Sequence, residues 1–367
     1  KYNDDIFKRI NITPGAKNHG MILVVDWSGS MDSCMYDTLI QTANLVMFCK
    51  AVQIPCKVYA FSDVNKRHFK LNSEDGYTYE NENELIMENV TMIELVDTTV
   101  KTPQYNASMA YFHKIIDYYS HRGSGRYYHY DDDRDYKFKM PSCMRLGGTP
   151  LDSAILQSID LVNNFQKEYK VQKMTTIFLT DGCGHVKGAF TKERDQSKQF
   201  QPYDGDVTNK YNADYSNGQL VIQDGNYQFK YNDRHTTRSV FKAAHEGMFN
   251  YFKHKTNSQL IGFYITHGKN VSFSDVSSHV STKNEYLGYE KYEEYKKELR
   301  ANGCISIKNV GYDELYILPK SKLQVKDEEV NITNDMTTAK MKQQFLKNFK
   351  SKKVSRVLLN KFISKVA

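Results

Sequence analysis

The sequence lacks several patterns that would place it in familiar classes of protein. Its 367 residues contain no apolar run that approaches the length of a membrane span, so no transmembrane helix is predicted. The 6 cysteines are scattered without a Cys-x-x-Cys pair, which speaks against a disulfide framework and against a zinc site. We therefore expect reduced thiols in an intracellular protein, with Cys34, Cys49 and Cys56 in the core.

Common hydrolase motifs are missing as well. The sequence has no His-Glu-x-x-His zinc motif, no Gly-x-Ser-x-Gly nucleophile turn and no P-loop, which argues against an enzyme. The chain starts at Lys1 rather than Met and shows no signal-peptide pattern. This start favours a trimmed chain or the carboxyl-terminal part of a longer one.

The positive charge gathers near the carboxyl terminus. The net charge is +7, and residues 320–367 hold 12 Lys or Arg against 4 Asp or Glu. Such a segment can bind nucleic acid or an acidic partner, but no aromatic-interleaved basic groove accompanies it. We interpret it as the solvated face of amphipathic helices, expected at 336–349 and 354–366.

The most informative stretch runs from Met21 to Met31. Five apolar residues in a row predict a strand buried on both faces of a parallel sheet. Asp26, Ser28 and Ser30 follow at Asp-x-Ser-x-Ser spacing, which places a carboxylate and two hydroxyls on one tight loop. Oxygen ligands of this kind suit Mg²⁺ or Mn²⁺. The alternative is an ordinary turn in which Ser30, Asp32 or Ser33 caps the next helix.

The rest of the chain alternates strands with helices. The predicted class is α/β: a doubly wound, mostly parallel sheet with helices on both faces and large insertions. Expected strands are 56–61, 174–180, 260–266 and 314–318, with a hairpin at 220–230; expected helices are 33–51, 150–165, 237–254 and 288–301. We expect an entry segment at 1–20, the main domain at 21–319 and a basic helical segment at 320–367.

Two polar stretches interrupt this alternation. We interpret residues 67–145 and 187–235 as insertions into the main domain. The first contains two expected helices, around Asn83–Met92 and Asn106–Tyr119.

Three segments bring oxygen groups to the carboxyl ends of the predicted strands, where doubly wound sheets bind ligands. They are the Asp26 loop, Thr149 before a helix, and Asp181 after the strand at 174–180. Two carboxylates and three hydroxyls leave a bound Mg²⁺ with an open position that captures an anionic oxygen from another molecule. The three segments together favour the metal site over the helix cap.

These motifs resemble the von Willebrand factor type A (vWA) domain. The resemblance rests on Asp-x-Ser-x-Ser, Gly-Gly-Thr-Pro-Leu and Leu-Thr-Asp-Gly, and it covers about residues 20–62, 146–182 and 258–266. It implies a metal-ion-dependent adhesion site (MIDAS) whose ion binds an acidic side chain of a partner protein. The ligands that it implies, direct or through water, are Asp26, Ser28, Ser30, Thr149 and Asp181.

Within the vWA family, the sequence is most similar to the vWA subunit of cobaltochelatase and to related proteins of tailed bacteriophages. The Asp-Trp-Ser-Gly-Ser-Met loop, the Glu-Leu-Tyr-Ile-Leu-Pro stretch and the closing basic helix carry this similarity. Those relatives work beside an AAA+ ATPase of the MoxR type, which implies such a partner here.

The leading hypothesis is thus a non-enzymatic, Mg²⁺-dependent protein-binding module. One alternative is an enzyme, either a hydrolase or a cobaltochelatase-type component of a metal-insertion complex. Another is a virion or assembly protein of a phage. Trp27, Met31 and His185 are candidate partner contacts; Trp27 has packing against the sheet as its alternative role, and His185 has an ordinary surface loop.

Overall fold

A single large sheet organises the part of the chain that the structure describes. The computed structural model describes residues 18–64, 85–86, 90–120, 138–182, 188–189, 220–224, 226–231, 237–280, 287–308, 310–323 and 361. Within these residues the main sheet has seven strands in the order β10-β11-β9-β5-β1-β2-β4. The strands are β1 (His19–Asp26), β2 (Cys56–Ser62), β4 (Thr91–Asp97), β5 (Lys173–Thr180), β9 (Gln259–Thr266), β10 (Ile305–Ile307) and β11 (Glu314–Pro319).

The sheet is parallel in its centre and antiparallel at its edges. Strand β1 pairs in parallel with β2 and β5, β5 pairs with β9, and β9 pairs with β11. The edge strands β4 and β10 run antiparallel to their neighbours. The carboxyl ends of the five parallel strands therefore meet at one edge of the sheet, as the sequence predicts.

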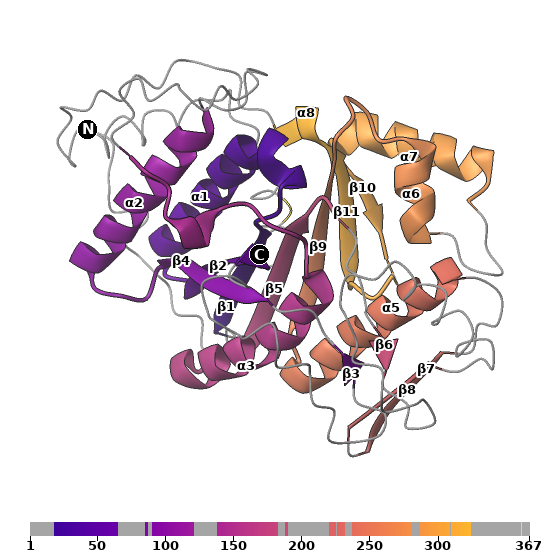
Figure 1. Ribbon diagram of the computed structural model, residues 1–367, viewed down its shortest axis with the longest axis horizontal. Coiled ribbons are helices and arrows are strands. Elements are labelled where there is room, and N and C mark those ends of the chain that lie inside the picture. Colours follow the sequence, from indigo (N-terminus) through magenta and orange to yellow (C-terminus); the bar gives the residue numbers. More distant parts are fainter. Residues whose placement is uncertain are drawn as a thin grey trace, which may run out of the picture.

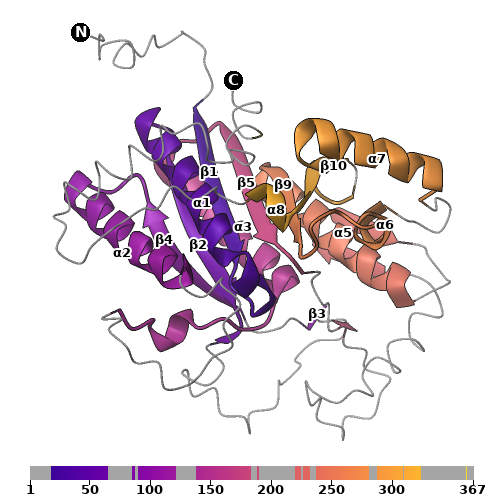
Figure 2. The same cartoon turned by 90° about the horizontal axis from the view of Figure 1, so that it is seen from above.

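Helices cover both faces of this sheet. Figures 1 and 2 show α1 and α2 on one face and α3 and α5 on the other. The predicted α/β class, mostly parallel with helices on both faces, is confirmed. The described helices are α1 (Met35–Ala51), α2 (Thr102–Ser120), α3 (Leu151–Tyr169), α5 (Thr237–Thr256), α6 (Phe273–Val280), α7 (Tyr289–Asn302) and α8 (Lys320–Leu323).

Strand β1 shows why the opening apolar run does not alternate with polar residues. Met21, Leu23 and Val25 pack into the core beneath α1 and α2, whereas Ile22 and Val24 pack into the core beneath α3 and α5. All five side chains are fully buried. Both faces of the strand are thus apolar because both are covered. The predicted burial of Cys34, Cys49 and Cys56 is confirmed, and each is a free thiol.

The range 67–145 contains more of the main domain than expected. The prediction of a helix around Asn83–Met92 is wrong, because the strand β3 (Leu85–Ile86) and the start of the edge strand β4 lie there. Thr91, Ile93 and Val96 are β-branched, and pairing with β2 outweighs the helical spacing. The helix expected at 106–119 is confirmed as α2, which packs on α1 and β4.

Two small sheets lie outside the main one. Strand β3 pairs with β6 (Gly188–Ala189). Strands β7 (Leu220–Asp224) and β8 (Tyr227–Tyr231) form the predicted hairpin, which packs on α5. The helices expected at 336–349 and 354–366 lie outside the described residues, apart from the helical Lys361.

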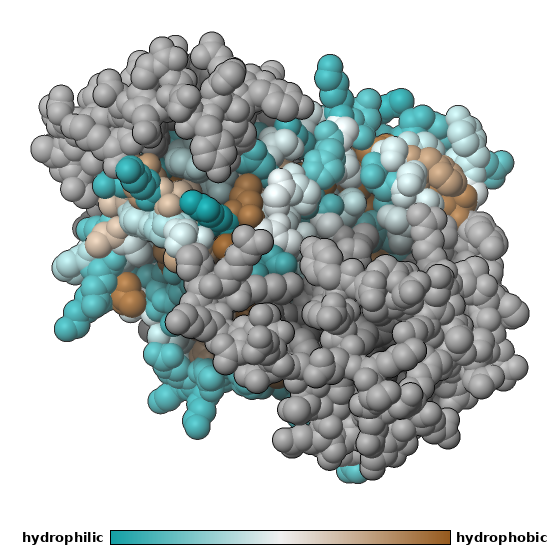
Figure 3. All heavy atoms as spheres, in the orientation of Figure 1, coloured by the Kyte–Doolittle hydropathy of each residue, from teal (hydrophilic) through white to brown (hydrophobic). Residues whose placement is uncertain are grey.

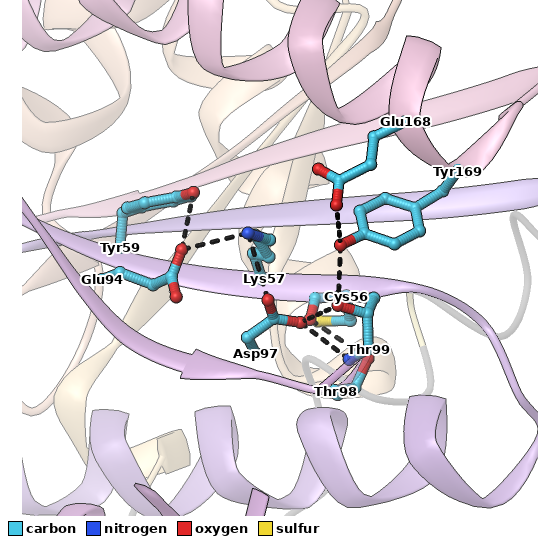
Figure 4. A network of polar contacts seen from close by, with 9 residues as sticks. All are labelled: Cys56, Lys57, Tyr59, Glu94, Asp97, Thr98, Thr99, Glu168 and Tyr169. Atoms are coloured by element: carbon cyan, nitrogen blue, oxygen red, sulfur yellow. Dashed lines mark hydrogen bonds and ion pairs between the residues drawn. The ribbon is translucent and has the colours of Figure 1, made fainter. Parts of the chain in front are cut away.

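A polar network fastens β4 to β2 near the amino end of the parallel strands (Figure 4). Lys57 Nζ lies 3.2 Å from Glu94 Oε2 and 3.1 Å from Asp97 Oδ2. The backbone N–H of Thr99 donates to Asp97 Oδ1 at 2.7 Å, and the Thr99 hydroxyl donates to Tyr169 Oη at 2.9 Å. The network also reaches α3 through Tyr169 and stabilises the sheet at the end opposite the Asp26 loop.

The described surface in Figure 3 is mostly hydrophilic, with a smaller hydrophobic area over α6 and α7. Phe273, at the start of α6, is an exposed large hydrophobic residue. None of the helices in the described ranges combines the length and apolar character that crossing a membrane requires.

Candidate metal centre

Asp26 is the last residue of β1 and points its carboxylate into a dry environment. Its side chain is fully buried. The Thr180 hydroxyl donates to Asp26 Oδ2 at 2.6 Å, whereas Oδ1 has no hydrogen-bond partner among the described residues. Burial raises the pKa of Asp26 to about 7, and the nearby carboxylate of Asp181 adds to the rise. A cation beside Oδ1 would supply the missing partner.

The two serines continue from Asp26 toward solvent. Ser28 is buried and Ser30 is exposed, and their hydroxyl oxygens lie 3.0 Å apart. Ser30 Oγ donates to Asp181 Oδ1 at 2.8 Å, although the two residues are 151 positions apart. The Asp26 loop after β1 and the Asp181 loop after β5 therefore meet through this hydroxyl.

The spacing of these oxygens matches a small octahedral ion. Mg²⁺ binds oxygen at about 2.0–2.1 Å, so neighbouring ligands of one ion lie about 2.9 Å apart. The Ser28–Ser30 and Ser30–Asp181 distances are 3.0 and 2.8 Å. The same separations are those of ordinary O–H···O hydrogen bonds, which both pairs make here.

The cap interpretation of the serine loop is wrong. The short 3₁₀ helix Ser30–Ser33 and the following α1 both begin without a side-chain cap hydrogen bond. The Ser30 hydroxyl bonds across the sheet edge to Asp181 instead of to a backbone N–H of its own helix.

The third segment pairs with the Asp26 loop through its backbone. Gly29 N–H donates to the Gly147 carbonyl at 2.8 Å, and Gly147 N–H donates to the Trp27 carbonyl at 3.0 Å. These bonds bring the chain before α3 beside β1. Thr149 then lies next to the Asp181 loop, because a Cβ built on Gly182 would stand 3.3 Å from Thr149 Oγ1.

Two consecutive glycines permit this approach. A Cβ on Gly147 would lie 2.4 Å from Val64 Cγ2 and 2.5 Å from Ser62 Oγ, which no side chain tolerates. Gly148 N–H donates to Asp63 Oδ1 at 2.6 Å. Asp63, in the turn after β2, therefore fixes the backbone immediately before Thr149.

Asp181 is enclosed on both sides of its carboxylate. Its side chain is 0% exposed, and His267 Nε2 lies 3.1 Å from Oδ2. Burial raises the pKa of Asp181, while the Ser30 hydrogen bond and His267 act against the rise. Two neighbouring carboxylates in a dry site, both with raised pKa values, form an electrostatically unfavourable pair that a divalent cation would relieve.

The structure thus links Ser28, Ser30 and Asp181 by hydrogen bonds. Asp26 lies close enough to Asp181 for the two charges to interact, and Thr149 lies beside Gly182. Two carboxylates and three hydroxyls fit a hard cation such as Mg²⁺ or Mn²⁺. In the described ranges, no group of three His, Cys, Asp or Glu side chains could hold a metal ion. Asp26 and Asp181 are the two charged residues among the candidate ligands.

The three candidate partner contacts are Trp27, Met31 and His185, and the structure describes two of them. Trp27 and Met31 are fully buried, so an exposed role for either one is wrong. The packing alternative for Trp27 is confirmed: its indole N–H donates to the Met144 carbonyl at 2.8 Å, and its ring meets Tyr119 edge-on. His185 lies outside the described residues.

Three residues of the site escaped the sequence analysis. The Thr180 hydroxyl donates to Asp26, and Asp63 accepts from the backbone N–H of Gly148, next to Thr149. His267 lies in contact with Asp181. Thr180 ends a buried strand, and Asp63 and His267 directly follow one, at the sheet edge where the Asp26 and Asp181 loops lie. A search for every polar residue at the ends of buried apolar runs would have found them.

The comparisons with known proteins leave the class of protein open. No family model matches the chain, and no curated protein does. Among solved structures, it is similar to the pilus adhesin SpaC from Lactobacillus rhamnosus GG in its open conformation, with 12% identity and a TM-score of 0.34 over 91% of this chain. It is also similar to the human COPII-coat protein Sec24c, with 9% identity and a TM-score of 0.26 over 71% of this chain and 27% of that one.

The chain spans only 30% of the adhesin's length. A second form of the adhesin gives 13% identity and a TM-score of 0.33, over 78% of this chain and 30% of that one. TM-scores this low do not establish a common fold.

Proposed function

We propose that this protein is a vWA-type module that binds Mg²⁺ or Mn²⁺ and uses the ion to hold a carboxylate of a partner protein. The observation that carries the proposal is the buried carboxylate of Asp26, whose Oδ1 has no hydrogen-bond partner in the described chain. It stands beside the linked Ser28, Ser30 and Asp181 side chains. The ligands are the residues that the vWA resemblance implies.

The charge of the site supports a binding role. Only two of the ligands carry charge, and the hydroxyls are neutral, so a divalent cation at this site is not fully charge-neutralised. Such an ion keeps water at its remaining positions, and an anionic oxygen from outside replaces that water. Ser30 is exposed, so the site opens toward solvent on the serine side. An acidic side chain of another protein suits this opening, and the resemblance implies an AAA+ ATPase of the MoxR type as the partner.

The test is a pull-down from lysate of the source cell with the purified chain as bait, in 5 mM Mg²⁺ or in EDTA. The variants are Asp181→Ala and, as a matched control, Asp160→Ala, which removes an exposed carboxylate from α3. We expect a partner that is captured by the wild type and Asp160→Ala in Mg²⁺ only, and lost with Asp181→Ala.

Mass spectrometry of the eluate then identifies the partner, with a MoxR-type ATPase expected. Calorimetry with Mg²⁺ alone checks that the ion binds without the partner. Capture that persists in EDTA or with Asp181→Ala, or an absence of Mg²⁺ binding by the wild type, contradicts the proposal.

A further inference from the structure

His267 stands directly after β9, the neighbour of β5 in the sheet. Its Nε2 lies 3.1 Å from Asp181 Oδ2, and its side chain is 54% exposed while that of Asp181 is 0% exposed. The imidazole therefore lies between the buried carboxylate and solvent. No motif of the vWA resemblance includes this residue.

The two oxygens of Asp181 have different partners. Oδ1 accepts from Ser30 on the side of the serine loop, and Oδ2 faces His267. A carboxylate turns about its Cβ–Cγ bond, so contacts at both oxygens fix its plane. Asp26 also has different surroundings at its two oxygens, since Thr180 donates to Oδ2 and no described residue donates to Oδ1. In Asp181 no hydrogen bond reaches Oδ2, and the imidazole of His267 lies beside that oxygen.

We infer that His267 is a positioning residue of the proposed metal centre. Its ring stands with Nε2 3.1 Å from Asp181 Oδ2 and limits rotation of the carboxylate, so that Oδ1 stays directed toward Ser30 and Ser28, where the ion binds. Neighbours of this kind orient the ligands of metal sites and commonly decide their affinity. His267 itself makes no bond to the ion, so the ligand set stays purely oxygen. This inference rests on the proposed function.

The inference rests on a polar side chain beside Oδ2 and not on the charge of the imidazole. A glutamine side chain places an amide N–H in a similar position and does not titrate. His267→Gln is therefore the conservative variant and His267→Ala the disruptive one.

The experiment measures Mg²⁺ affinity of the purified chain by calorimetry, and Mn²⁺ binding from the loss of the free-ion electron paramagnetic resonance signal. We expect His267→Ala to weaken both by about 10- to 100-fold. His267→Gln should stay within about threefold of the wild type. His254→Ala is the matched control, because His254 is an exposed histidine near the end of α5 and before the amino end of β9. It should bind both ions as the wild type does.

Thermal unfolding in EDTA separates positioning from folding. Since the His267 side chain is half exposed, the Ala variant should melt within a few degrees of the wild type without metal, and differ from it only when Mg²⁺ is added. Unchanged Mg²⁺ and Mn²⁺ affinity in His267→Ala, or equal losses in the Ala and Gln variants, overturns the inference while leaving the proposed function intact. A wild type that binds neither ion overturns both.

Discussion

Replacing Asp26 with asparagine should stabilise the metal-free protein, which is the opposite of what removing a buried polar contact normally does. The carboxylate is fully buried, and its pKa lies at about 7, whereas an unperturbed Asp has a pKa of 3.8. Each unit of difference corresponds to about 1.4 kcal/mol, so keeping Asp26 ionised at pH 8 costs the folded state up to about 4 kcal/mol. Asparagine has nearly the same shape and no charge.

The pH dependence follows from the direction of this shift. Between about pH 4 and pH 7 the folded chain holds a proton on Asp26 that the unfolded chain has lost. The free energy of unfolding of the wild type therefore falls as the pH rises through this window and levels off above about 7. The Asp26→Asn variant lacks this contribution. Its advantage should be near zero at pH 4 and reach up to about 4 kcal/mol at pH 8.

The assay is urea unfolding in EDTA, followed by circular dichroism at several pH values, and repeated in 5 mM Mg²⁺. Magnesium should stabilise the wild type and leave Asp26→Asn unchanged. Asp97→Asn provides the matched control, because Asp97 is also buried but pairs with Lys57 at the opposite edge of the sheet. That variant should lose about 1–3 kcal/mol with or without Mg²⁺. If Asp26→Asn is no more stable than the wild type at pH 8 in EDTA, the reasoning about the buried carboxylate is refuted.

Three further predictions concern the same site. The Mg²⁺ affinity of the wild type should fall by up to about tenfold for each pH unit below about 7, because the ion displaces the proton of Asp26; a flat calorimetric profile from pH 5 to 8 would contradict this. Asp63→Ala should weaken Mg²⁺ binding about tenfold by releasing the Gly148 N–H, whereas Asp63→Asn, which keeps an acceptor, should bind nearly as the wild type does. Gly147→Ala should cost about 1–3 kcal/mol in unfolding free energy, because its Cβ would lie 2.4 Å from Val64; a melting curve identical to that of the wild type would show that the loop has room to move.

Much of the fold follows from local pattern. The apolar runs at Met21–Val25 and 174–180 are long and unbroken because helices cover both faces of the central strands, and this makes them easy to recognise. The ligand positions follow as well, since an acid after such a strand lies at the edge where parallel strands end. Asp26 ends β1 and Asp181 directly follows β5, and these two strands are adjacent in the sheet.

The features that escaped prediction depend on distant partners. Strand β4 has one face on a helix and lies at the sheet edge, so its apolar pattern is weak and only pairing with β2 defines it. His267 follows Asp181 by 86 positions, and only the parallel pairing of β5 with β9 brings the two together. For Trp27 the sequence left an exposed and a packed role open, because its burial depends on the distant Tyr119 and the Met144 carbonyl.

The position of that tryptophan has a practical consequence. Trp27 is the single tryptophan of the sequence. Its backbone carbonyl accepts from the N–H of Gly147, and its indole N–H donates to the Met144 carbonyl. Its fluorescence therefore originates entirely from the junction between the Asp26 loop and the segment that carries Thr149. A dry, hydrogen-bonded indole emits at shorter wavelength than one in water. The chain thus contains an intrinsic optical reporter, and its emission maximum follows that junction without any attached label.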